Sequence, residues 1–148
     1  MDHYNANDAA TVELLAEMYR NVKMGSESLA AVVPKIRDHG LMSTVTAQLE
    51  QYADFTDRTT KLLTRRSVKP QEPSLLKRAM TRGGIMMNTM MDPTPGHIAD
   101  MIAKGTKTGM TQLEDKLGEL EARGCSREAA DLCRDILAFE ESASQGGK

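Results

Sequence analysis

The fold is decided by a repeat of two stretches, KMGSESLAAVVPKIRDHG (23–40) and KTGMTQLEDKLGELEARG (107–124). The two stretches share the spacing of their lysine, glycine and leucine residues. They belong to a longer match without gaps, of residues 13–57 with residues 97–141. Identical or similar residues recur along it: Leu14 with Ile98, Gly25 with Gly109, Leu29 with Leu113, Gly40 with Gly124 and Phe55 with Phe139. Such a repeat indicates two similar supersecondary units that pack against each other.

The inward positions of the first copy recur at alternating intervals of three and four, which is typical of a helix packed in a bundle. They are Val12, Leu15, Tyr19, Val22, Ser26, Leu29, Val33 and Ile36. Gly40 suits the left-handed residue that ends a helix, and Ser43 suits the cap of a second helix. Because the link is so short, we expect the two helices to form an antiparallel hairpin.

The second copy predicts the same arrangement, with Thr94 and Pro95 at the start of its first helix and Gly124 and Ser126 between its two helices. Residues 67–95 do not fit the repeat, and within them Ser74–Met91 is expected to form a short helix capped by Ser74. No segment has the pattern of a strand. We therefore expect one all-α domain (1–148): hairpin one (8–66), a long crossover with a short helix (67–95), hairpin two (96–142), and loose tails at 1–7 and 143–148.

Composition restricts the classes of function. The net charge is −2 and aromatic residues make up 3% of the chain, which disfavours nucleic-acid binding. The apolar runs are too short for a membrane-spanning helix. The polar start of the sequence has no signal-peptide core, and Cys125 and Cys133 would lie about 12 Å apart along one helix, too far for a disulfide. We expect a reduced, cytoplasmic protein without integral membrane association.

Two antiparallel hairpins joined by a long crossover resemble the ferritin-like four-helix bundle, whose halves are also related by a pseudo-twofold axis. The stretches KMGSE (23–27) and MMNTMMDPTPGHIAD (86–100) are similar to uncharacterised small bacterial proteins placed near that superfamily. The resemblance covers residues 8–142 and concerns architecture. It implies a bacterial source and no known activity.

A ferritin-like di-iron or di-manganese centre needs Glu-x-x-His on two of its helices. That motif occurs nowhere in this sequence, and the inner stripes identified above carry no carboxylate. We therefore expect an apolar bundle centre that holds no cofactor. The alternative is a degenerate metal site made of Glu13, Glu17, Glu50 and His97.

The crossover is rich in methionine, with Met80, Met86, Met87, Met90 and Met91 in one short stretch. Methionine is flexible and common at adaptable binding surfaces, and its soft thioether can also bind Cu(I). We expect this face to pack against the bundle's own helices or across a homodimer. A groove for another protein is the alternative, and copper binding is the least favoured reading.

Basic residues concentrate in the same region, with seven lysines and arginines from Lys61 to Arg82 and only Glu72 to oppose them. Lys77, Arg78 and Arg82 lie beside the methionines. A basic amphipathic segment can bind anionic membrane surfaces or acidic partners. The plainer reading is a solvated patch balanced by acidic residues elsewhere in the fold.

Gly25 and Gly109 occupy matching positions within predicted helices, where glycine costs about 1 kcal/mol relative to alanine. Their presence in both copies indicates a close approach of helices or space for a ligand at the bundle centre. No arrangement typical of nucleophilic catalysis or of a phosphate-binding loop occurs. The sequence therefore predicts a non-enzymatic binding or protein-interaction module whose working surface is the crossover.

Overall fold

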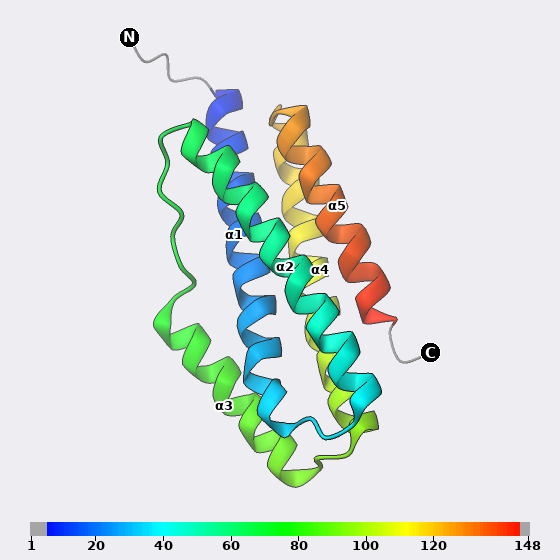
Figure 1. Ribbon diagram of the computed structural model, residues 1–148. Helices are drawn as coiled ribbons and strands as arrows, with labels where there is room; N and C mark the ends of the chain where they lie inside the picture. Colours follow the sequence, from blue (N-terminus) through cyan, green and yellow to red (C-terminus); the bar gives the residue numbers. More distant parts are fainter. Residues whose placement is uncertain (1–5, 146–148) are drawn as a thin grey trace.

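The computed structural model describes residues 6–145, and all regular structure within that range is helical. The order along the chain is α1 (Ala6–Val32), a 3-10 turn (Val33–Lys35), α2 (His39–Arg65), α3 (Leu75–Met91), α4 (Pro95–Ala122) and α5 (Arg127–Ser144), as Figure 1 shows. The all-α prediction is confirmed. Of the expected loose tails, residues 1–5 and 146–148 lie outside the described part of the chain, while α1 and α5 extend to Ala6 and Ser144.

Four helices, α1, α2, α4 and α5, form the bundle, in which α1 packs on α2 and on α4, and α4 packs on α5 (Figure 1). Their facing sides bury an aliphatic core that includes Leu14, Met18, Val22, Val45, Leu120 and Ile136. Each such side chain stabilises the fold by about 1.5–3 kcal/mol. The rings of Phe55 and Phe139, which align in the predicted repeat, meet in this core, with centroids 5.7 Å apart.

The first hairpin turns differently from the prediction. The α1 helix ends two residues before Pro34, because proline lacks the backbone N–H that a helix needs and its ring clashes with the preceding turn. Asp38, not Ser43, caps α2, since its carboxylate accepts a 2.8 Å hydrogen bond from the Leu41 backbone N–H. Gly40 therefore lies in the first turn of α2, and its predicted left-handed role at a helix end is wrong.

The other predicted helix ends are confirmed. Ser74, Thr94 and Ser126 cap α3, α4 and α5, and each side chain accepts a hydrogen bond from the backbone N–H three residues later. Gly124, after α4, has a φ of 84°, a left-handed conformation that glycine adopts without steric strain. Ser67, after α2, also has a left-handed φ, of 58°, although it carries a Cβ.

The crossover runs from the end of α2 along the outside of the bundle to α3, which lies beside α1 (Figure 1). Its middle is fixed to α1, because the Tyr19 hydroxyl donates a 2.9 Å hydrogen bond to Glu72 Oε1. The neighbouring Pro73 is buried. These contacts set where α3 begins and hold it against one face of α1.

Candidate functional site

The contact between α3 and α1 is made by the more polar side of α3. The Arg78 guanidinium donates two hydrogen bonds to the Glu27 carboxylate, one of them 2.7 Å from Nε to Oε1. This hydrogen-bonded ion pair lowers the pKa of Glu27. Thr89 is the buried residue of α3, and its hydroxyl donates to carbonyls of its own helix. The helix is thus held to α1 by this ion pair, and Ile85 of α3 packs against the core.

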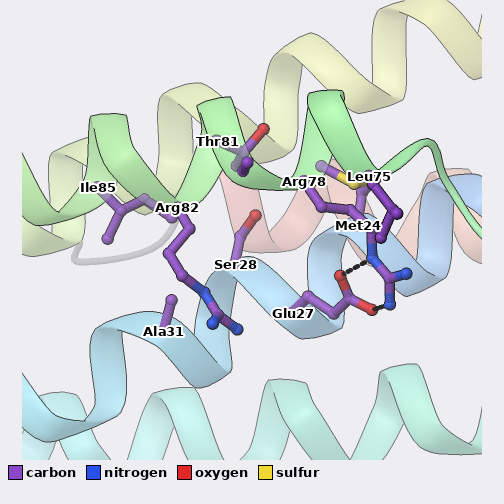
Figure 2. Close-up of a pocket in the computed structure, with 10 residues that line it drawn as sticks. Met24, Glu27, Ser28, Ala31, Leu75, Arg78, Thr81, Arg82 and Ile85 are labelled. Atoms are coloured by element: carbon purple, nitrogen blue, oxygen red, sulfur yellow. Dashed lines mark hydrogen bonds and ion pairs between the residues drawn. The ribbon is translucent and has the colours of Figure 1, made fainter.

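Two hollows flank this contact. The one in Figure 2, with a volume of about 470 Å³, contains the Arg78–Glu27 pair, and Arg82 extends across it from α3 toward α1. The other, of about 640 Å³, lies between α1, α3 and α4. Both are lined by Met24 and Ile85. The line of close contact between α3 and the bundle is therefore narrow.

The opposite side of α3 leaves a large apolar surface in solvent, which we call the α3 face. It consists of Leu75, Leu76, Met80, Met86, Met87, Met90 and Met91. Met91 is 83% exposed and Met87 is 68% exposed. The sequence predicts that these methionines pack either against the bundle's own helices or across a homodimer. The first arrangement is wrong for Met80, Met87, Met90 and Met91, because α3 presents Arg78, Thr81, Ile85 and Thr89 to α1 instead, and the second stays a prediction.

The basic residues of this region are partly neutralised in the fold. Lys61 pairs with Asp57 at 3.0 Å, Arg65 pairs with Glu128 at 2.9 Å, and Arg78 pairs with Glu27. Lys77 and Arg82 are exposed beside the α3 face. The arrangement favours the plainer reading, a solvated patch that acidic residues of the bundle balance.

The residues of the alternative metal site are engaged elsewhere or exposed. Glu13 forms ion pairs with Lys116 and Arg123, and Glu17 forms one with Arg20. Glu50 is exposed on α2, and His97 lies 3.8 Å from Asp92 at the start of α4. Across the described residues, no group of three or more His, Cys, Asp or Glu side chains is placed to hold a metal ion.

Sequence reasoning missed the polar cluster at the inner end of the larger hollow. Glu140 of α5 is only 2% exposed, and its Oε2 accepts a 2.9 Å hydrogen bond from the Tyr52 hydroxyl of α2. Burial raises the pKa of Glu140 to about 7, although hydrogen bonding by Tyr52 and Asn21 opposes that rise. The expectation of a bundle core without a carboxylate is therefore wrong. The missed clue was the spacing, because Glu140 continues the inward series Cys133, Ile136, Ala143.

Asn21 of α1 lies beside this carboxyl group. Its Nδ2 donates a 3.1 Å hydrogen bond to the carbonyl oxygen of Gly109 on α4. Neither Asn21 Oδ1 nor Glu140 Oε1 has a hydrogen-bond partner among the described residues, and both atoms are buried. Both residues line the 640 Å³ hollow, so two acceptors without partners belong to its inner end.

Gly25 and Gly109, which align in the predicted repeat, line the same hollow, and both readings suggested for them have support. A Cβ at Gly25 would lie 2.5 Å from Tyr52 Cζ, and a Cβ at Gly109 would lie 3.2 Å from Asn21 Nδ2. The close approach of the Tyr52 ring therefore favours glycine at position 25, whereas a Cβ at position 109 would require only a small shift of the Asn21 amide. A third glycine of the lining, Gly105, has no atom within 4 Å of its Cβ position.

The two cysteines are poorly suited to nucleophilic chemistry. Cys125 and Cys133 are free thiols, and burial raises the pKa of Cys133 to about 12, so it is a poor nucleophile.

Within residues 6–145, no helix has the length and apolar character needed to cross a bilayer. Comparison with protein-family models, with curated proteins and with solved structures finds no match for this chain.

Proposed function

We propose that this protein is a non-enzymatic binding module whose working surface is the α3 face, and that the face binds the same helix of a second copy. The observation that carries the proposal is the orientation of α3, which keeps seven large apolar side chains in solvent. Stable monomers seldom expose contiguous apolar patches beyond a few hundred Å². A helix only about 25 Å long that presents so many apolar groups is typical of an interface.

The spacing of the α3 face favours a helical partner. Leu76, Met80, Gly83, Met87 and Met90 follow one another at intervals of four, three, four and three residues. This is the a/d pattern of helices that pack side by side. Methionine adapts its shape to a facing helix more easily than branched residues do.

The position of Gly83 favours a second copy as that helix. Gly83 is the central residue of α3, and nothing lies within 4 Å of its Cβ position. An antiparallel pair related by a twofold axis would cross at this glycine, so that Leu76 and Met80 of each copy face Met87 and Met90 of the other. A twofold interface must be self-complementary in this way.

The charges beside the α3 face are compatible with that pairing. Lys77 lies six residues from Gly83, so the two Lys77 side chains would be about 18 Å apart along an antiparallel pair. Salt screens such a separation at physiological ionic strength. Arg82 lies nearer the crossing point but lines the hollow toward α1 (Figure 2).

The test is the oligomeric state of a variant that combines Met87→Asp and Met90→Asp. We expect the wild type to sediment as a dimer and the variant as a 16.3 kDa monomer. The variant should melt below the dimeric wild type, which association stabilises, but at the same temperature as wild type diluted to its monomeric state, because both side chains are exposed on the single chain. The matched control combines Ser43→Asp and Ala47→Asp on the exposed side of α2, and we expect it to remain dimeric.

A second variant, Gly83→Leu, separates helix stability from pairing. Leucine is a better helix former than glycine, so α3 should become more ordered while the close crossing is blocked and the dimer is weakened at least tenfold. A wild type that stays monomeric at millimolar concentration contradicts the proposal. If that monomer bound phosphatidylserine vesicles through the α3 face, the peripheral-membrane reading with Lys77 and Arg82 would replace it.

The ferritin-like relationship is also a proposal. It is supported by the order of two short-linked hairpins around one long connection and by the burial of Leu14, Leu29, Ile98 and Leu113, which are equivalent pairs. An experimental structure tests it, because residues 13–57 should superpose on 97–141 through a twofold axis. Superposition that places these pairs in unrelated surroundings would overturn it.

A further inference from the structure

The hollow between α1, α3 and α4 has the size and lining of a ligand pocket. Its volume of about 640 Å³ lies within the range of 300–1,000 Å³ that is typical of small-molecule sites. Apolar side chains from all three helices line it, among them Met24, Leu29, Ile85, Met101, Ile102 and Leu113. An apolar body therefore fits most of this space.

When Glu140 is ionised, two oxygen atoms at the inner end of the pocket have no hydrogen-bond donor among the described residues. Glu140 Oε1 and Asn21 Oδ1 are buried acceptors without partners among the described residues, and leaving a buried polar group unpaired is destabilising. The Tyr52 hydroxyl bonds to Glu140 Oε2, and one N–H of the Asn21 amide bonds to the Gly109 carbonyl, so neither of these bonds reaches Glu140 Oε1 or Asn21 Oδ1. A ligand that supplies N–H groups at this point would satisfy both oxygens.

We infer that this pocket binds a small apolar molecule that carries one protonated amine, with the ammonium group held by Glu140 and Asn21. An ammonium group offers three donors and no acceptor, and its bond to an ionised carboxylate is stronger than a neutral hydrogen bond. The inference goes beyond the proposed pairing of α3 and does not depend on it.

The charged residues around the pocket favour an amine ligand over a carboxylate ligand. Of the cations that line it, Arg20 is paired with Glu17 at 2.7 Å and Lys77 is exposed, so neither lies buried beside Glu140. A carboxylate ligand at the inner end would therefore face acceptor oxygens without a compensating charge. A neutral alcohol offers a single donor and gains no charge-assisted bond.

The protonation state of Glu140 provides a second way to detect binding of an amine. Its raised pKa means that the carboxyl group of the empty pocket is partly protonated near pH 7. A bound ammonium group favours the ionised form and lowers that pKa. Binding of an amine should therefore release protons, and the measured heat should depend on the ionisation enthalpy of the buffer.

The experiment is calorimetric titration of the full chain with hexylamine, octylamine and decylamine, beside octanol and octanoate. We expect at least one amine to bind, octanoate not to bind, and octanol to bind more weakly than octylamine. The variant Glu140→Gln keeps an acceptor for Tyr52 but removes the charge. It should weaken amine binding about 10- to 100-fold and abolish the proton release.

A matched pair of variants on α4 shows whether the pocket is the site. Gly105 lines the pocket and Gly118 does not, and both Cβ positions are open. We therefore expect Gly105→Met to fill the pocket and block octylamine, and Gly118→Met to leave binding intact, while both proteins stay folded by circular dichroism.

Three results would overturn the inference. The first is that none of the amines binds the wild type. The second is that octanoate or octanol binds as tightly as octylamine. The third is that amine binding survives in Glu140→Gln without a change in affinity or in proton release.

Discussion

The four helices of the bundle and α3 have similar amphipathic sequences but bury opposite faces. In the bundle, Leu14, Met18 and Ile136 are fully enclosed. In α3, the residue enclosed is Thr89, and the methionines face water. The difference shows that periodicity predicts a helix and its apolar stripe, whereas the covering of that stripe depends on contacts made elsewhere. In α3, Arg78 pairs with Glu27 and thereby directs the polar side to α1.

The largest expected effect on the free energy of unfolding comes from comparing a methionine of the bundle core with a methionine of α3. Met18 of α1 is 0% exposed and Met91 of α3 is 83% exposed. Met18→Ala should lower the free energy of unfolding by about 2–5 kcal/mol because it leaves a cavity in the core. Met91→Ala should change it by less than about 0.5 kcal/mol. Urea denaturation of the dilute, monomeric protein measures both, and similar losses would contradict the difference in burial.

The two regions should also respond oppositely to pH. The pKa of Glu140 is raised in the folded protein to about 7 from an ordinary value of 4.5, so its contribution to stability is fully present below pH 4.5. It is lost as the pH rises to about 7, by about 3 kcal/mol in total. The pKa of Glu27 beside Arg78 is lowered, so the stabilisation by that pair is present at neutral pH and is lost on acidification.

The measurement is the free energy of unfolding of the wild type and of Glu140→Gln between pH 4 and pH 8. The difference between the two proteins isolates the buried carboxyl group from all other acids. A difference that stays constant across this range would show that Glu140 titrates normally. Glu27→Gln is the matched control for the contact between α1 and α3, and it is measured from pH 8 to below pH 4. The stabilisation that Glu27 provides over glutamine should be constant above pH 4.5 and should decrease only as the pH falls below that value.

Glycine-to-alanine substitutions sharpen the comparison, because the same substitution should destabilise the bundle at one position and stabilise α3 at another. Gly25→Ala places a Cβ against the ring of Tyr52, which Glu140 and the edge-on contact with Phe139 hold in position. We expect a loss of about 1–3 kcal/mol in unfolding free energy. Gly84→Ala meets no atom within 4 Å and should stabilise α3 by about 1 kcal/mol.

Hydrogen exchange at individual amides measures both glycine variants, since it resolves local opening of α3 from global unfolding. We expect slower exchange within α3 for Gly84→Ala and faster exchange throughout the bundle for Gly25→Ala. Unchanged protection of the bundle in Gly25→Ala would mean that the Tyr52 ring moves aside without cost.

The helix of the crossover could be predicted from its sequence because its determinants are local. Ser74 caps it and the apolar residues follow a helical period, and the structure gives α3 within these limits. Its orientation could not be predicted in this way, because it depends on Arg78 meeting Glu27, 51 residues earlier. The Glu140 site was missed for the same reason, since its hydroxyl partner Tyr52 is 88 residues away. The repeat also concealed Glu140, because the aligned residue of α2 is Thr56, an ordinary polar residue.

The smallest expected effect concerns the two places where a helix ends in a left-handed residue. Gly124 ends α4 inside the bundle's second hairpin, and Ser67 ends α2 where the chain leaves for the crossover. At both, backbone N–H groups bond to carbonyls of the last helical turn: Gly124 to Glu121 and Ser67 to Thr64. The geometry is shared, but the Cβ of serine is strained at a positive φ.

Ser67→Gly should therefore stabilise the protein by about 0.5–1 kcal/mol, and Gly124→Ala should destabilise it by about 1 kcal/mol. The gain at Ser67 is smaller than the strain alone, because glycine also has more freedom in the unfolded chain, which opposes it. Urea denaturation of both variants checks the signs. A loss of stability in Ser67→Gly would mean that the entropy of the unfolded chain exceeds the strain, and that the exit to the crossover is as relaxed as the turn inside the bundle.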